Sequence, residues 1–246
     1  MSVNRRAWDG FVSNRGMPAS ARATAASPAP ARPYGGLAMA ERVAARRARF
    51  IEAGIELFGT QGFRGATVRG VCAAAGLTDR YFYESFASLE ALLADVYGTV
   101  KDGFARRLMD ESFGAEGWHG DDAAVERQVT AAYEIWFDTV RDPRFARILL
   151  VEVLGVSPQM DALYEASARA MAELTLTPLA ATRPALKLSK PRRELLGRAL
   201  VGAALQVAKM WMTGGYKLPR RDVVRTCVLV ATGTLAALRA EAADGP

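Results

Sequence analysis

The sequence predicts an all-α protein in which a three-helix helix-turn-helix domain near the N-terminus is followed by a larger helical bundle. Three observations support this class. Apolar residues recur at spacings of three and four from Ala40 onward. No run of alternating β-branched residues indicates strands. Capping residues, prolines and glycines stand where one periodic stretch ends and the next begins.

The first 40 residues are predicted to form a disordered tail. The stretch Pro18–Pro33 consists almost entirely of Ala, Ser, Thr, Pro and Arg and has no apolar periodicity. Such a segment cannot bury enough surface to offset the entropy cost of ordering. No apolar stretch follows Arg5 and Arg6, so they do not predict a twin-arginine export signal. A transit peptide fits the composition, and a translation start at Met39 stays open.

Behind the tail, the periodic stretches predict a chain of helices. Asp142 and Ser157 each precede a proline and a periodic stretch, which is typical of a helix start. Gly155 and the pair at 214–215 mark helix ends. The predicted helices span residues 42–60, 68–75, 79–86, 88–112, 121–141, 143–154, 158–176, 191–213 and 220–241.

The helix-turn-helix lies within the first three of these helices. In the first helix, Ile51, Gly54, Leu57 and Phe58 form one apolar stripe, and the glycine leaves room for a neighbouring helix. The second helix, residues 68–75, begins after a good N-cap residue, threonine 67. These features predict that the first helix packs closely against a neighbouring helix.

A sharp turn joins the second and third helices. Gly76 can adopt the positive φ that such a turn requires, and Leu77 is the apolar residue that packs between the helices. Thr78 caps the third helix, which turns two phenylalanines inward. The residues left on its outer face are Arg80, Tyr81 and Glu84.

Positive charge is concentrated in the first third of the chain. Residues 1–87 carry twelve arginines, no lysine and six acidic residues, whereas residues 88–246 carry twenty basic and twenty acidic residues. A basic segment on a neutral body is the electrostatic pattern of a nucleic-acid binder. A solvated basic tail without a partner explains the charge equally well.

The motifs decide between these two explanations. Five stretches, residues 46–58, 62–69, 75–78, 82–86 and 88–93, resemble the TetR family of transcriptional regulators in order and in spacing. They read RRxxFIxAGxxLF, GFxxATVR, AGLT, FYxxF and SxEALL. The resemblance implies a DNA-binding domain over residues 41–92 and a regulatory and dimerisation domain over residues 93–246.

The resemblance also implies roles for individual residues at a DNA major groove. Arg80 is expected to donate to guanine O6 and N7, with Thr78 beside it at the groove. Tyr81 is expected to contact a thymine methyl group or the backbone. The residues expected to contact phosphates are Thr67, Tyr83, Arg46 and Arg47.

Three positions depart from the family pattern. Asp79 and Leu89 stand where the family usually has lysine, and Ser85 stands where it usually has histidine. Two cations are therefore missing, although Arg80 and the arginine-rich tail are able to compensate. An alternative hypothesis is a helical, ligand-binding adaptor with degraded DNA binding.

The resemblance implies that the last two helices pair with those of a second subunit to form a homodimer. The helix 191–213 carries small residues that permit close helix contact, and the helix 220–241 has apolar residues at spacings of three and four. A dimer spaces two recognition helices about one DNA turn apart, roughly 34–36 Å, as a pseudo-palindromic operator requires. The resemblance implies a repressor as the family's default role, and the alternative of an activator stays open.

The repressor is expected to leave DNA when a small, apolar effector binds in the bundle. The helix from Leu89 to Leu108, which joins the two domains, is expected to transmit the change. Aromatic and methionine residues are the candidate pocket lining. The candidates are Tyr133, Trp136, Phe137, Tyr164, Met171 and Trp211, together with Phe145 and Met160.

Other classes of protein are disfavoured. The sequence has no Gly-rich phosphate loop, no His/Cys metal spacing and no nucleophile elbow, so we expect neither an enzyme nor a metal or cofactor. His119 is isolated in a glycine-rich loop, and Cys72 and Cys227 are predicted to be buried apolar residues. The uncharged stretch 226–238 is too short for a membrane span. We expect a bacterial cytoplasmic protein associated with the nucleoid.

Overall fold

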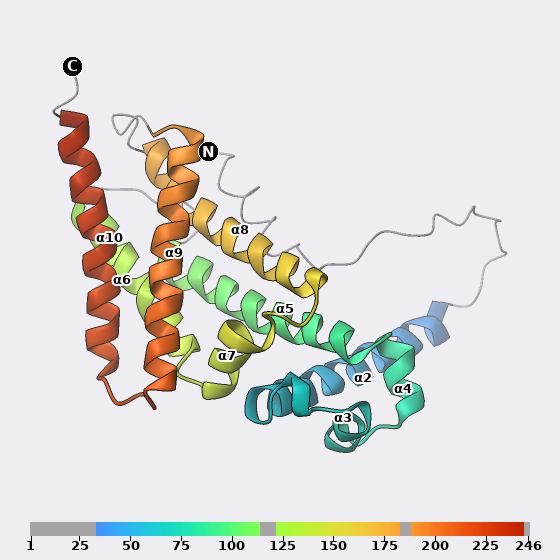
Figure 1. Cartoon of the computed structure of the whole chain (residues 1–246). Coiled ribbons are helices and arrows are strands. Elements are labelled where there is room, and N and C mark those ends of the chain that lie inside the picture. Colours follow the sequence, from blue (N-terminus) through green and yellow to red (C-terminus); the bar gives the residue numbers. More distant parts are fainter. Residues whose placement is uncertain (1–32, 114–121, 183–187, 244–246) are drawn as a thin grey trace.

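The computed structural model describes residues 33–113, 122–182 and 188–243, and it confirms the all-α class. These stretches form helices joined by short loops, without a β-strand among them. Figure 1 shows a small group of helices at one end, the head, and a larger bundle, the body. His119 lies outside the described residues.

The head consists of three helices, and the second and third agree closely with the bounds predicted from the sequence. The three are α2 (Pro33–Thr60), α3 (Val68–Ala75) and α4 (Asp79–Ser85), with a short 3-10 turn, η1 (Phe63–Gly65), after the first. The shorter helices α3 and α4 lie across the long α2, at the end of the molecule farthest from α9 and α10 (Figure 1).

The start of α2 differs from the prediction. The helix begins at Pro33 rather than near residue 42, so the last part of the predicted disordered tail is helical. Residues 39–45 are exposed, and the segment is rich in Ala, Arg, Met and Glu, which are strong helix formers. Intrinsic propensity therefore extends the helix beyond the apolar stripe from which its start was predicted.

The body is built on α5 (Leu89–Arg107), which runs from the head into the bundle (Figure 1). The other body helices follow along the chain. They are α6 (Asp122–Thr139), α7 (Pro143–Arg147), α8 (Pro158–Thr182), α9 (Lys190–Thr213) and α10 (Arg220–Ala243). Within the body α5 packs against α6, whereas α8 packs mainly against α9 and α10 mainly against α6.

Two predicted helices end in wider, π-helical turns. The helix that begins at residue 89 changes at η2 (Leu108–Phe113), and α7 changes after one turn at η3 (Ile148–Glu152). Apolar periodicity does not distinguish these turns from α-helix, because both keep one face toward the core. Short π-helical turns often occur at functional sites.

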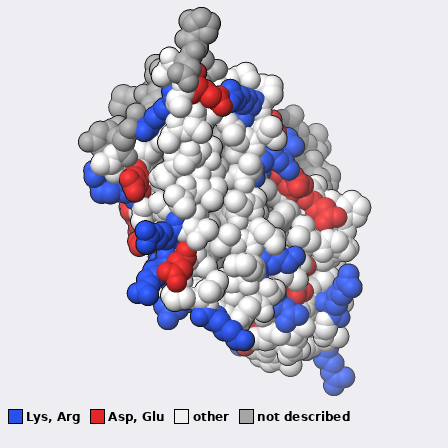
Figure 2. Space-filling model, turned by 60° about the vertical axis from the view of Figure 1, so that its left-hand side comes forward, with Lys and Arg blue, Asp and Glu red and all other residues white. Residues whose placement is uncertain are grey.

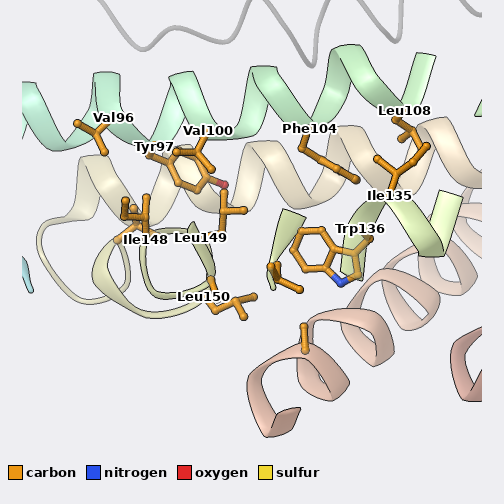
Figure 3. Close-up of a cluster of buried hydrophobic side chains, with 14 of the residues drawn as sticks. Val96, Tyr97, Val100, Phe104, Leu108, Ile135, Trp136, Ile148, Leu149 and Leu150 are labelled. Atoms are coloured by element: carbon orange, nitrogen blue, oxygen red, sulfur yellow. The ribbon is translucent and has the colours of Figure 1, made fainter. Parts of the chain in front are cut away.

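One apolar core joins head and body. In the head, the ring of Phe50 meets those of Phe82 and Phe86 edge-on, at centroid distances of 5.5 and 6.2 Å. In the body, side chains from α5, α6 and η3 meet in the cluster drawn in Figure 3. Cys72 and Cys227 are buried and unbridged, as predicted.

The helix α10 is longer and more apolar than the 226–238 stretch suggests. By length and composition it could cross a membrane, and 28% of its most apolar window is buried inside the protein. Its inner face packs in the body through Val223, Val224 and Cys227. At its start, Arg220 forms an ion pair with Asp138 of α6 at 2.7 Å. We therefore describe α10 as a bundle helix with one open apolar face.

Candidate nucleic-acid interface and ligand cavity

The turn between α3 and α4 has the geometry that its glycine predicts. Gly76 has a φ of 61° and a ψ of 37°, in the left-handed region. A Cβ atom at this position would lie 3.0 Å from Nη2 of Arg49. The same Nη2 donates to the carbonyl oxygen of Ala75 at 2.6 Å. The turn is thus held by a side chain of α2 as well as by its own backbone.

Sequence reasoning missed Arg49. Its place beside Phe50 on the first helix was visible, but the carbonyl that it reaches comes from a different helix. Arginine side chains often satisfy the last carbonyls of a helix. Here the capping arginine belongs to another helix, and the fold alone brings the two together.

The two threonines lie at helix N-termini, as predicted. The hydroxyl of Thr67 accepts a hydrogen bond from the backbone N–H of Gly70 at 3.1 Å and so caps α3. Thr78 begins α4, is exposed and makes no side-chain capping bond. Next to it, Asp79 faces Cys72. Burial and this carboxylate together raise the pKa of the Cys72 thiol to about 11, which keeps it in the neutral form.

The outer face of α4 is open to solvent. The side chain of Arg80 is 84% exposed, and its contact with Glu84, at 3.1 Å, is a surface ion pair of small energetic value. Tyr83 is 62% exposed, and its ring and that of the buried Phe82 meet edge-to-face at a centroid distance of 5.4 Å. The side chains of Arg80 and Tyr83 can therefore reach a partner without breaking a buried contact.

The other predicted contacts are more enclosed. Tyr81 is half-buried beneath Arg46, whose guanidinium carbon lies 4.4 Å from the ring centroid. Arg47 donates to the carbonyl oxygen of Ser85, pairs with Asp95 and stacks over a phenylalanine ring. The structure therefore gives Arg47 an internal role, holding α2 against the end of α4 and the start of α5.

A cavity of about 150 Å³ lies in the body. Its lining comes from α5, η2, α6, η3, α8, α9 and α10 and is almost entirely apolar. Of the predicted pocket residues, four line it: Tyr133, Trp136, Tyr164 and Met171.

The remaining candidates lie elsewhere. Phe137 is fully buried and packs edge-on against Trp211, at a centroid distance of 5.8 Å. The indole of Trp211 donates to the carbonyl oxygen of Leu218 at 2.8 Å, so it belongs to the corner before α10. Phe145 and Met160 also lie outside the lining. Helical spacing identifies inward-facing aromatics, but it does not distinguish those that meet a void from those that meet other side chains.

The cavity also has polar lining residues that the sequence did not indicate. Lys101 is buried and pairs with the carboxylate of Asp102 at 2.8 Å. Burial raises the pKa of Tyr97 to about 12, although a hydrogen bond with Ser167 acts in the opposite direction. No group of three metal-ligating side chains occurs in the described part of the chain.

Head and body meet at a packed junction. Nη1 of Arg144 lies 2.8 Å from a carboxylate oxygen of Glu56. Beside it, a Cβ atom at Gly59 would lie 2.4 Å from Cβ of the same arginine. The first helix thus has no space for a side chain where α7 crosses it.

A second set of contacts links η3 to the end of the first helix. The carboxylate of Glu152 accepts hydrogen bonds from the backbone N–H of Phe63 and from Nε of Arg147, both at 2.6 Å. Arg147 also donates to the carbonyl oxygen of Thr60 at 2.8 Å. In the same π-helical turn, Leu149 lines the cavity. This turn therefore touches both the cavity and the head.

The outer sides of α9 and α10 form an uncovered apolar face. Leu195 and Leu229 are 70% and 69% exposed. Figure 2 shows a broad uncharged band on this side of the molecule, with charged side chains along its margins. The exposed residues recur at spacings of three and four along each helix. They include Leu195, Ala199, Gly202, Gln206 and Met210 on α9, and Thr226, Leu229, Val230, Gly233 and Ala237 on α10.

Residues 50–96 match the family of bacterial regulatory proteins described as the tetR family. The match covers the end of α2, all of α3 and α4, and the start of α5. A comparison with curated proteins finds no significant match.

Solved structures share the fold over most of the chain. The FadR regulator from Bacillus subtilis in complex with stearoyl-CoA has a TM-score of 0.62 and 13% identity, over 75% of this chain and 97% of that one. The fatty acid degradation regulator FadR from Bacillus halodurans has a TM-score of 0.61 and 16% identity, over 76% and 95%.

A tetR-family transcriptional regulator from Streptomyces coelicolor has a TM-score of 0.59 and 21% identity, over 80% of this chain and 82% of that chain. These likenesses concern the whole fold, whereas the family match concerns the head. Residues 50–96 thus match the tetR-family model, and the described head and body together share the fold of solved tetR-family transcriptional regulators.

Proposed function

We propose that the protein is a repressor that binds a pseudo-palindromic operator as a homodimer and releases it when a small, largely apolar molecule enters the cavity. The observation that carries this proposal is the outer face of α4. It presents Arg80 and Tyr83 to solvent at the end of the molecule farthest from α9 and α10 (Figure 1). A recognition helix needs such an unobstructed face to enter a major groove.

In this proposal, some polar residues of the head contact DNA and others hold the helices of the head together. Arg80 is placed to read a base edge, with Thr78 and Tyr83 beside it. Thr67, at the start of α3, is placed to meet a phosphate. Arg46 and Tyr81 form a stacked pair at the edge of this surface. For Arg47, a phosphate contact would require it to leave Ser85 and Asp95.

The alternative function is a helical adaptor that does not bind DNA. Asp79 and Leu89 favour it, because they remove two cations from the head. The exposed Arg80 favours DNA binding, since its surface pair with Glu84 is easily exchanged for a base or a phosphate. Binding through phosphates weakens steeply between low and physiological salt, whereas an adaptor would show no DNA binding at either.

The proposed dimer uses the uncovered face of α9 and α10. Gly202 and Gly233 lie on it in mid-helix, where glycine costs stability relative to alanine. A Cβ atom at either would meet nothing within 4 Å. Nothing in the described part of the subunit therefore requires a glycine there, whereas a second copy packed closely against the face would. A partner subunit also covers Leu195 and Leu229, which are otherwise left in water.

The size of the cavity limits the proposed effector. A cavity of about 150 Å³ has room for a benzene-sized molecule, whereas pockets for drug-sized ligands are about 300–1,000 Å³. Stearoyl-CoA, present in the Bacillus subtilis structure, is much larger. An effector of that kind would require the lining helices of this chain to move apart.

Two elements are placed to couple the cavity to the head. The helix α5 runs directly between them, and η3 touches the cavity through Leu149 and the head through Glu152. An effector releases DNA only if it binds one arrangement of the heads better than the other. A coupling of about 1–3 kcal/mol would change DNA affinity roughly 5–150-fold.

Selection of bound sequences from random duplex DNA tests the function. The wild-type protein should enrich an inverted repeat with half-sites about one DNA turn apart. The Arg80→Ala variant should lose preference at one base pair of each half-site and bind about 10-fold more weakly. Arg169→Ala, which removes an exposed arginine from α8, outside the head and outside the apolar face, is the matched control and should select the wild-type sequence.

Two results would contradict the proposal. One is a purified protein that binds no duplex at low salt, which would favour the adaptor. The other is an Arg80→Ala variant that selects the same sequence with the same affinity, which would remove α4 from the DNA interface.

A further inference from the structure

The outer face of α4 carries a carboxylate whose charge does not suit a DNA-binding surface. Glu84 lies one helical turn after Arg80 on the same face, and its side chain is 43% exposed. A carboxylate that approaches a duplex is repelled by the phosphates. Any contribution of Glu84 to DNA binding must therefore come from its contacts within the head.

Glu84 holds Arg80 by one edge of the guanidinium. Nε of Arg80 donates to Oε1 of Glu84 at 3.1 Å. Helical side chains lean toward the N-terminus, so a glutamate at this spacing reaches back to the arginine. Arg80 makes no other hydrogen bond or ion pair within the described part of the chain, and its side chain is 84% exposed. Its two terminal nitrogens, Nη1 and Nη2, are therefore open to a partner.

The two terminal nitrogens of an arginine are able to read guanine by themselves. The guanidinium is planar and carries five N–H donors in a fixed geometry. Nη1 and Nη2 can donate together to O6 and N7 of one guanine while Nε–H is directed elsewhere. The exclusion of water at an interface also strengthens an ion pair that is weak at a free surface. The contact between Nε and Glu84 can thus persist when Arg80 binds a base.

Glu84 is itself held by a second arginine. Nη2 of Arg46, on α2, lies 4.0 Å from Oε2 of Glu84. The guanidinium of Arg46 stacks on the ring of Tyr81, and its side chain is only 21% exposed. The two oxygens of Glu84 therefore face different arginines, one enclosed in the head and one open to solvent. The enclosed arginine compensates the charge of Glu84 and restricts its position.

We infer that Glu84 is a positioning residue for sequence recognition: it holds Arg80 at Nε and leaves Nη1 and Nη2 free to donate to a guanine, while Arg46 holds Glu84. The inference rests on the proposed function, because it concerns the same recognition helix. Arg80 contacts the base, and Glu84 acts through it. Glu84 therefore improves discrimination between bases, although its charge lowers the affinity for DNA of any sequence.

Fluorescence anisotropy with three duplexes tests the inference on the full chain. The first duplex is the sequence that the wild-type protein enriches from random DNA. The second has an A·T pair in place of the G·C pair whose preference Arg80→Ala loses, and the third is a scrambled sequence. The Kd of the second duplex divided by that of the first measures discrimination. The Kd of the third duplex at low salt measures non-specific affinity.

Glu84→Ala should lower the discrimination about threefold, because Arg80 loses the acceptor that orients it. The same variant should bind the scrambled duplex about twofold more tightly, since one carboxylate leaves the DNA-facing surface. Glu84→Gln keeps an oxygen that accepts from Nε, so it should retain most of the discrimination and still gain non-specific affinity. Glu52→Ala, which removes an exposed carboxylate from α2, is the matched control and should leave the discrimination unchanged.

A purely structural role of Glu84 predicts a different pattern. If Glu84 only stabilised α4, its variants would bind all three duplexes more weakly by the same factor, and the discrimination would keep its wild-type value. That result would overturn the inference, as would unchanged Kd values for all three duplexes. In the Arg80→Ala background, Glu84→Ala should have no effect on discrimination, and a further loss there would show that Glu84 does not act through Arg80.

Failure of the inference is distinguishable from failure of the proposed function. A wild-type protein that binds none of the duplexes excludes both. A wild-type protein whose base preference depends on Arg80 but not on Glu84 excludes the inference alone.

Discussion

Glu152 of the body accepts a hydrogen bond from the backbone N–H of Phe63 in the head, at 2.6 Å. The same carboxylate pairs with Arg147, which in turn donates to the carbonyl oxygen of Thr60. The end of the first helix is therefore tied to the body by charge-assisted hydrogen bonds. A head attached in this way moves with η3 rather than swinging freely on a linker.

Replacing Glu152 by alanine should destabilise the protein by about 2–3 kcal/mol. The change leaves the N–H of Phe63 and the guanidinium of Arg147 without their shared acceptor in a partly buried place. Urea denaturation measures the loss. Glu165→Ala is the control, because its pair with Arg198 lies at the surface and should contribute roughly 0–1 kcal/mol. Equal losses in the two variants would show that the junction is no stronger than an exposed ion pair.

Replacing Gly76 by alanine should cost roughly 1–2 kcal/mol, because a left-handed backbone disfavours a Cβ atom. The added atom would also press on Arg49 at 3.0 Å. Gly98→Ala, within α5, is the control. A Cβ atom there meets nothing within 4 Å, and alanine is the better helix former, so that variant should be as stable as wild type or more stable. Thermal unfolding that ranks the two variants the other way would contradict the turn geometry.

Replacing Leu229 by glutamate should turn a dimer into a monomer and weaken operator binding at low protein concentration. The residue is 69% exposed in the centre of the apolar face, and a charge there would be buried in a close-packed interface. Light scattering gives the mass. Leu154→Glu changes an exposed leucine between η3 and α8, on neither helix of that face, and should leave the mass unaltered. A wild-type protein that is already monomeric at working concentrations would exclude this use of the face.

Acid should weaken the junction through Asp142. Hydrogen bonds from the side chain of Arg144 lower the pKa of its carboxyl group, and burial opposes them less strongly. The pKa of Asp142 is lower in the folded protein than in the unfolded chain. The stabilisation that its ionised carboxylate gives to the folded state is therefore complete above a pH of about 4, and it disappears as the pH falls through the lowered pKa. The free energy of unfolding should therefore fall less steeply below that pH in Asp142→Asn. Arg144→Ala should flatten the curve in the same way, and an unchanged slope in both variants would be the contrary result.

Local patterns predicted much of this protein correctly. The helices 68–75 and 79–85 of the head agree with the capping threonines and the glycine turn, because caps and turns depend on neighbours in the chain. Four of the residues predicted for a ligand pocket line the cavity, since inward-facing side chains of a bundle lie close to any void it encloses. The early start of α2 was missed, because an exposed helix has no apolar stripe from which to read its start.

The sequence by itself determined the helical class, the positions of the caps and turn of the head, and the outward position of Arg80 and Glu84 on α4, whereas Tyr81, also predicted to face outward, is half-buried under Arg46. Each correctly determined feature follows from interactions within a few residues along the chain. Tertiary structure alone decided the placements that join distant segments. It brought Arg49 to the end of α3, engaged Arg47 with Ser85 and Asp95, and left the indole N–H of Trp136 without an acceptor among the described residues while that of Trp211 found one. Such contacts depend on how helices pack in three dimensions, and spacing along one helix does not specify which neighbour its side chains will meet.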